Sequence, residues 1–193
     1  SYTVLVSVGS TALVARLVGA GDWDGAKRAT AQAVLLAVGF GVAGAVAGIV
    51  GLPWLIAALG LTGDAAAYCL AYLTPLAILL PFQITESACV ACLAGAGDTR
   101  TGLKVLGGVA VLNVPLAWAL CFGVGPLPGL GFPGIALGTG VSHLIGCVIV
   151  LSMLARGRSG LTVTPAALRP DRGLIARVLR VSVPAGVDSL SVA

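Results

Sequence analysis

The sequence predicts an all-α fold, a polytopic bundle of membrane-spanning helices. Of the 193 residues, 58% are hydrophobic and only 9% are charged, whereas a soluble domain carries about 25% charged residues because its surface faces water. Aromatic residues make up only 5%, and the chain contains 28 glycines. Small side chains let membrane helices approach one another closely, so the composition favours tightly packed helices in a bilayer.

Apolar segments recur along the chain at lengths that fit a membrane helix, which needs about 20 apolar residues. We predict four complete spans, with a partial span at each end of the chain. In order they lie at residues 1–15, 29–63, 65–97, 105–123, 135–155 and 174–193. The second segment is too long for one helix, and Pro53 lacks a backbone donor. We therefore predict a break at Gly51-Leu52-Pro53, followed by a short interfacial helix over 53–60.

All 11 Lys and Arg residues fall in alternate connections between these spans. Positive charge marks the cytoplasmic side of a membrane protein, so this pattern supports both the span count and the orientation. On this layout the first span runs inward, and we expect at least one helix before Ser1 and further chain after Ala193. The basic residues form no long run, so we predict the lipid bilayer as a partner and no nucleic acid. They are Arg16, Lys27, Arg28, Arg100, Lys104, Arg156, Arg158, Arg169, Arg172, Arg177 and Arg180.

The tetrapeptide Gly-Ala-Gly-Asp occurs at 19–22 and again at 95–98, each time at a predicted cytoplasmic helix end. Glycine tolerates the left-handed conformation that closes a helix, and Asp accepts the first free amides of the next one. Each copy therefore predicts a helix stop followed by a cap.

Small residues recur every fourth position in the fifth segment, at Gly134, Gly138, Ser142 and Gly146. This spacing places them on one helix face that seats another helix; we expect a neighbour in the same bundle rather than a second molecule. Five cysteines lie inside apolar segments, and Cys89 and Cys92 form a C-x-x-C without a second ligand pair. We predict no metal site and no cofactor.

Several segments resemble the MATE (multidrug and toxic compound extrusion) family of transporters. Gly-Ser-Thr-Ala-Leu-Val-Ala-Arg at 9–16 with Gly-Ala-Gly-Asp at 19–22 is similar to the family's second helix and following loop. Leu-Ala-Gly-Ala-Gly-Asp-Thr-Arg-Thr at 93–101 is similar to the loop between its fourth and fifth helices, and residues 131–138 resemble the start of its sixth. Ser-Val-Pro-Ala-Gly at 182–186 matches the seventh.

The resemblance implies a fragment of a two-lobe transporter. Residues 1–155 would be most of the first six-helix lobe, 156–173 a cytoplasmic linker, and 174–193 the start of the second lobe, which is the partner of the first in the full-length chain. The implied function is secondary active efflux of small cationic or amphipathic compounds in exchange for H⁺ or Na⁺, by alternating access. The implied location is the plasma membrane, which in bacteria is the inner membrane. It implies a transporter and not an enzyme.

Ionisable groups inside a membrane are costly and mark functional sites. Glu86 lies within an otherwise uncharged span, one turn after Gln83 and near Pro75 and Pro81, whose missing hydrogen bonds free backbone carbonyls. We take Glu86 as the leading candidate for a proton or cation carboxylate, with Gln83 beside it. The alternative is a structural hydrogen bond to a neighbouring helix.

Three further polar residues are candidates for ion or substrate binding. Asn113 matches an asparagine in the family's fifth helix, although Ala117 stands where many members carry Asn or Asp. His143 titrates near neutral pH or serves only in packing. Asp188 follows Pro184 by one turn and faces either the central cavity or solvent.

Two other functions remain open from the sequence. A flippase for lipid-linked sugars would have a related architecture and a more basic cavity, whereas the complete spans contain no Lys or Arg. A non-transport membrane protein, such as an intramembrane enzyme, would have to use Glu86, His143 and Cys89, and no catalytic motif joins them.

Overall fold

A computed structural model describes residues 2–125, 127–164, 168, 170, 171, 173–178 and 180. Within this part of the chain the helices are α1 (Tyr2–Gly19), α2 (Trp23–Ala58), α3 (Gly63–Gly95), α4 (Thr99–Phe122) and α5 (Phe132–Ala155). Helices α2 to α5 are each long and apolar enough to cross a membrane. The all-α fold and the four complete spans are thus confirmed; Asp188 and the matching segment 182–186 lie outside the described residues.

Three very short elements also occur in the described part of the chain, and residues 173–178 are helical. The connection between α4 and α5 contains an antiparallel pair of two-residue strands, β1 (Gly123–Val124) and β2 (Leu127–Pro128). A single turn of 3-10 helix, η1 (Arg158–Gly160), follows α5. The sequence interpretation did not anticipate the strand pair, which closes a tight turn and leaves the fold class unchanged.

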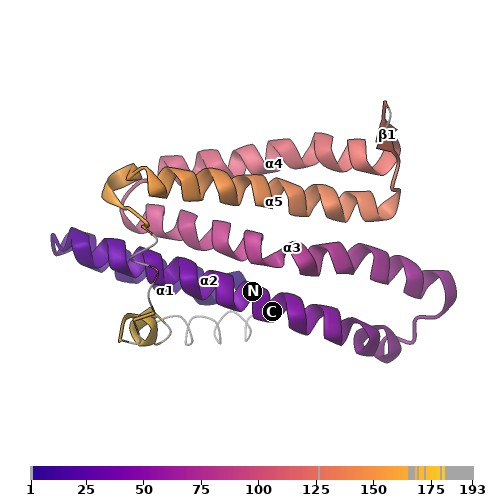
Figure 1. The fold of residues 1–193 in the computed structure, drawn as a ribbon, viewed down its shortest axis with the longest axis horizontal. Helices are drawn as coiled ribbons and strands as arrows, with labels where there is room; N and C mark the ends of the chain where they lie inside the picture. The colour runs from indigo at the N-terminus through magenta and orange to yellow at the C-terminus, as the bar shows by residue number, and fades with distance from the viewer. Residues whose placement is uncertain are drawn as a thin grey trace.

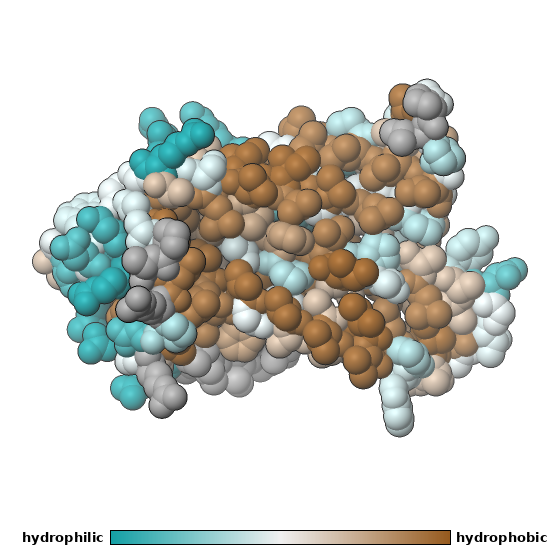
Figure 2. All heavy atoms as spheres, viewed as in Figure 1, coloured by the Kyte–Doolittle hydropathy of each residue, from teal (hydrophilic) through white to brown (hydrophobic). Residues whose placement is uncertain are grey.

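Helix α3 is the central element of the bundle. It packs against each of the other four helices, most extensively against α2 and α5. In Figure 1, α4 and α5 lie on one side of α3, and α1 and α2 lie on the other. Figure 2 shows hydrophobic residues across the middle of the surface and hydrophilic residues gathered at one end, where α2 begins and α5 ends. The charge pattern assigns that end to the cytoplasm.

The predicted break at Gly51-Leu52-Pro53 is wrong, because α2 continues through Pro53 to Ala58 without interruption. Proline removes one hydrogen bond, here to the carbonyl of Ile49, four residues earlier. Pro53 lies only five residues before the helix ends, so little of the hydrogen-bond ladder is lost. Membrane helices tolerate proline in this way, and α3 likewise contains Pro75 and Pro81.

Both Gly-Ala-Gly-Asp copies form the predicted stop and cap. Gly21 and Gly97 have φ angles of 76° and 87°, in the left-handed region that favours glycine. The amide of Gly25 donates to Asp22 Oδ1 at 2.8 Å, and the amide of Thr101 donates to Asp98 Oδ1 at 3.0 Å. The repeat therefore makes the same turn at the cytoplasmic ends of α1 and α3.

The small-residue face of α5 packs against α4 and α3 within the bundle. An added Cβ at Gly138 would lie 2.5 Å from the Cα of Ala117, and one at Gly134 would lie 2.4 Å from the carbonyl oxygen of Leu120. Contacts below 3.0 Å with backbone leave no room for any larger residue. The expected neighbouring helix is thus α4, and at Gly146 also α3.

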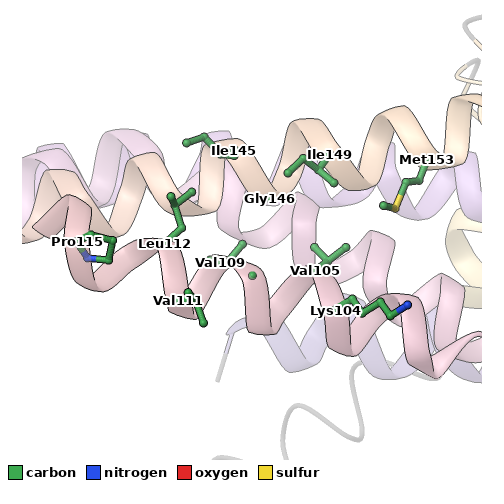
Figure 3. A pocket seen from close by; sticks show the side chains of 11 residues that line it. Lys104, Val105, Val109, Val111, Leu112, Pro115, Ile145, Gly146, Ile149 and Met153 are labelled. Carbon is green, nitrogen blue, oxygen red and sulfur yellow. The ribbon is translucent and has the colours of Figure 1, made fainter.

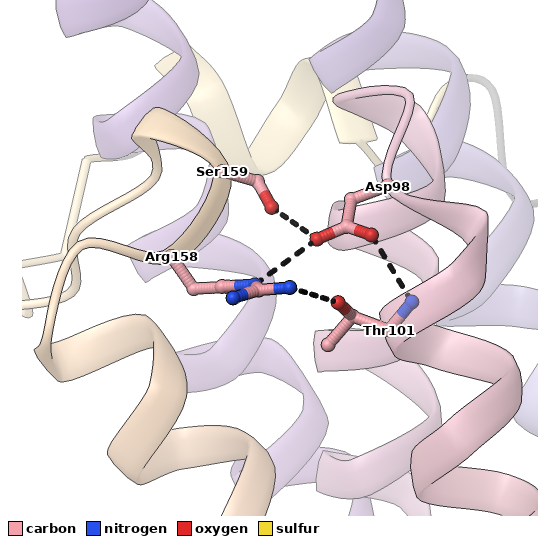
Figure 4. A network of polar contacts seen from close by, with 4 residues as sticks. All are labelled: Asp98, Thr101, Arg158 and Ser159. Carbon is pink, nitrogen blue, oxygen red and sulfur yellow. Dashed lines mark hydrogen bonds and ion pairs between the residues drawn. The ribbon is translucent and has the colours of Figure 1, made fainter.

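A polar network joins the α3–α4 turn to the segment after α5 (Figure 4). Asp98 Oδ2 accepts hydrogen bonds from the hydroxyl of Ser159 and, at 3.3 Å, from Arg158 Nε. Arg158 Nη2 also donates to Thr101 Oγ1 at 3.1 Å. Ser159 has a left-handed φ of 58°, which is unfavourable for a residue with a side chain; its bond to Asp98 offsets that cost.

Replacing Gly138 with Ala is expected to separate α4 from α5, because the new methyl group overlaps the backbone at Ala117. Overpacking of this kind costs about 1–3 kcal/mol. Gly107→Ala is the matched control, since a Cβ there meets nothing within 4 Å. Thermal unfolding of the purified full-length protein in detergent measures both; equal melting temperatures for the two variants would contradict the packing described.

Asp98→Asn is expected to destabilise the protein at neutral pH, and the loss of stability is expected to be smaller at strongly acidic pH. The hydrogen bond from Ser159, those from Thr101 and the bond from Arg158 hold the pKa of Asp98 well below its usual range. A lowered folded-state pKa gives stability above the unfolded pKa of about 3.9 that is lost as pH falls further. The difference in melting temperature between wild type and variant should stay constant from pH 7 down to about pH 4 and narrow progressively as the pH falls below that value.

The exposed Asp24 provides the control, because its one ion pair among the described residues is with Lys27 on the same helix turn. Such surface pairs contribute about 0–1 kcal/mol. If Asp24→Asn lowered the melting temperature as much as Asp98→Asn, the loss would follow from removing any carboxylate and not from the Asp98 network.

Candidate functional site

Glu86 is the single buried residue with a formal charge among the residues that the structure describes. Its side chain is 1% exposed, and it lies on the central helix α3, nine residues before the last residue, Gly95. At 1.5 Å per residue this is about 14 Å from the cytoplasmic end of the helix. Glu86 is thus inside the span, as predicted, in the cytoplasmic half of α3.

His143 on α5 is the partner of Glu86. Its Nδ1 lies 2.7 Å from Glu86 Oε2, a short distance typical of a charge-assisted hydrogen bond. The two residues are 57 positions apart in the sequence and meet because α3 and α5 pack closely together. Two residues that the sequence singled out separately therefore form one site.

The second carboxylate oxygen, Glu86 Oε1, is buried and has no hydrogen-bond partner among the described residues. An added Cβ at Gly146 would lie 2.8 Å from this oxygen and 2.4 Å from Val109 Cγ2. Gly146 therefore lies directly against Oε1, and glycine is required at position 146. A buried acceptor without a donor is unfavourable.

A groove between α4 and α5 lies beside Gly146 (Figure 3). It has a volume of about 400 Å³, and both Val109 and Gly146 line it. Its other walls are almost entirely apolar, with Lys104 at one end. Gly146 thus lies against the Glu86 carboxylate and also lines the groove. No sequence pattern singled out Val109, whereas Gly146 belongs to the small-residue face.

The other predicted candidates do not join the Glu86–His143 pair. Gln83 lines a separate cavity of about 660 Å³ between α2, α3 and α5, together with Tyr72 and Thr139. Asn113 is partly buried on α4, and within the described part of the chain no hydrogen bond connects it to Glu86 or His143. Roles for Gln83, Asn113 and Asp188 stay predictions.

Two cysteines lie on the same two helices as the Glu86–His143 pair. Cys89 lies one turn along α3 from Glu86, and Cys147 lies on α5. Cys89 and Cys147 are buried free thiols. No group of three metal-ligating side chains occurs among the described residues.

The fold and this pair define a polytopic helical membrane protein with an ionisable site buried between its spans. The sequence pattern of the MatE family matches residues 1–119, so the chain belongs to the MATE family of multi-pass membrane proteins and resides in the cell membrane. The resemblance noted in the sequence is confirmed.

Two curated relatives are probable multidrug resistance proteins. YoeA of Bacillus subtilis is 25% identical over 195 residues, which cover 100% of this chain and 42% of YoeA. NorM of Thermotoga maritima is 31% identical over 99 residues, which cover 51% of this chain and 21% of NorM. The chain therefore spans less than half the length of the relatives that it matches.

Solved structures of similar fold cover 98% of the chain. An inward-facing and an outward-facing structure of a multidrug resistance MATE family transporter each match with a TM-score of 0.88 at 22% identity, over 42% of their own length. A MOP superfamily transporter from Pyrococcus furiosus matches with a TM-score of 0.89 at 22% identity and 41% coverage. The described helices thus have the fold of a large part of these transporters.

Removing His143 is expected to destabilise the protein more than removing both members of the pair. In His143→Leu the buried Glu86 loses its partner, which costs about 3–5 kcal/mol for a buried charge. In Glu86→Leu/His143→Leu no unpaired polar group remains, so part of that loss is regained. A double-mutant cycle on melting free energies measures the coupling; additivity within about 0.5 kcal/mol would contradict the pair.

Proposed function

We propose that this chain is the first-lobe part of a secondary active efflux transporter. Its substrates are small cationic or amphipathic compounds, and the exchanged ion is H⁺. Family membership and the multidrug resistance relatives support the export function. The Glu86–His143 pair is the observation that supports coupling, because it places two titratable groups in contact inside the membrane.

The donor set around Glu86 favours H⁺ over Na⁺. Hard metal cations are bound by several oxygen ligands at once. Here Oε2 already faces His143, and Oε1 lies against Gly146, which presents no side-chain oxygen. A proton needs only one acceptor, and Oε1 is such an acceptor without a partner among the described residues.

Protonation at this pair changes the contact between α3 and α5. With Glu86 ionised, His143 is held by a charge-assisted hydrogen bond. When a proton binds to the carboxyl group, the charge is lost and that bond weakens, so the two protonation states favour different helix arrangements. A ligand shifts a conformational equilibrium by its differential affinity for the two states; the proton is that ligand in this proposal.

The lobe is proposed to move largely as one body. The described helices match the inward-facing and the outward-facing structures equally well, at a TM-score of 0.88. Alternating access then arises from movement of this lobe against a second one in the full-length protein, with residues 156–173 as the linker between lobes. No cofactor is needed, since the proton gradient supplies the energy.

Glu86→Gln in the full-length protein is expected to abolish proton-driven efflux, because glutamine cannot take up and release a proton. The assay follows a fluorescent cationic dye in inverted membrane vesicles energised by an imposed pH gradient. Asp64→Asn is the control, since Asp64 is exposed in the first turn of α3. An imposed Na⁺ gradient should drive no efflux in the wild-type protein.

Two outcomes would reject parts of this proposal. Unchanged pH-driven efflux in Glu86→Gln would remove Glu86 from the coupling step. Efflux driven by Na⁺ alone would contradict the choice of proton.

A further inference from the structure

Two adjoining cavities at the cytoplasmic end are lined by four arginines. Their volumes are about 230 and 570 Å³, and both are lined by Leu17, Asp22 and Arg177. They lie between the end of α1, the start of α2 and the helical residues 173–178. We call them together the basic pocket; its arginines are Arg16, Arg28, Arg177 and Arg180.

The described residues between 171 and 178 are held beside this pocket by hydrogen bonds and apolar packing. The side chain of Gln32, which is 2% exposed, accepts a hydrogen bond from the backbone amide of Asp171 at 3.0 Å. Asp171 Oδ1 in turn accepts from the amides of Gly173 and Leu174. Val178, 1% exposed, packs in the same hydrophobic cluster as Leu13 of α1. Arg177 is therefore held in place by its neighbours.

The arginines of the basic pocket have no ion-pair partner among the described residues. The carboxylates that line it are Asp22 and Asp171, and each already accepts amide hydrogens at the start of a helix. Four guanidinium groups face two carboxylates, which leaves an excess of positive charge. Arginine binds phosphate through two parallel hydrogen bonds, so a phosphate group is the complementary ligand.

The larger cavity also has an apolar wall. Ala12, Leu13 and Leu17 of α1 and Ala20 of the turn after it line this cavity beside Arg16, Arg177 and Arg180. A cavity with an apolar wall and a cationic end fits an amphipathic anion. The position of this cavity also fits an amphipathic anion, because hydrophilic residues gather at this end of the molecule next to the hydrophobic surface (Figure 2).

We propose that the basic pocket binds an anionic phospholipid of the cytoplasmic leaflet. The phosphate contacts Arg16, Arg177 and Arg180, and an acyl chain follows the apolar wall of α1. Basic pockets between membrane helices on the cytoplasmic side are typical sites for such headgroups. The bound lipid ties the helical residues 173–178 to α1, and this role is independent of the transported compound and of the Glu86–His143 pair.

The experiment titrates the full-length protein in detergent with phosphatidylglycerol, with phosphatidylcholine, or with soluble glycerol phosphate, and follows the melting temperature. Phosphatidylglycerol should raise it saturably, and the other two should not. Arg177→Gln should raise the half-saturating lipid concentration roughly fivefold, and Arg16→Gln/Arg177→Gln about 25-fold. Arg177→Lys, which keeps the charge, should raise the half-saturating lipid concentration less than Arg177→Gln does.

Arg100→Gln is the matched control, because Arg100 is an exposed cytoplasmic arginine outside the basic pocket; its lipid response should equal that of wild type. An undiminished response in the double variant, or equal responses to both phospholipids, would overturn the proposal. The same shift with glycerol phosphate would show that the pocket takes a soluble phosphate, and would overturn the lipid assignment.

Discussion

The close approach of α3 and α5 is the constraint on which the candidate site depends. Glu86 and His143 form a 2.7 Å contact inside an apolar bundle, and a membrane interior offers no water to replace it. The approach is possible because Gly146 leaves space for the carboxylate and Gly138 lets α5 lie against α4. The same glycines that pack the bundle thereby decide where a charged group can be accommodated.

The same packing explains why Glu86 Oε1 has no hydrogen-bond partner among the described residues. Gly146, which lies against this oxygen, has no side chain that could donate a hydrogen bond. A protein that needed Glu86 only for packing would be more stable with a donor at that place. The unsatisfied oxygen therefore supports a functional use of this carboxylate, in which its charge changes during a cycle.

Much of the fold could be predicted from the sequence, because span length and arginine placement are set by the bilayer itself. The continuation of α2 through Pro53 could not be predicted, because a proline near a helix end removes only one hydrogen bond and membrane helices tolerate that loss. Glu86 and His143 were each recognised as unusual, but their contact joins positions 57 residues apart. Such contacts depend on which face each helix turns toward its neighbours, and the 3.6-residue period alone does not determine that orientation.

The carboxylate of Asp98 has a mechanical consequence for the whole lobe. One of its oxygens holds the first turn of α4, and the other holds the turn that leads out of α5. A force on the chain beyond α5 is therefore transmitted through the Asp98 side chain to the turn between α3 and α4. A force from the rest of the molecule thus reaches α3, the helix that carries Glu86.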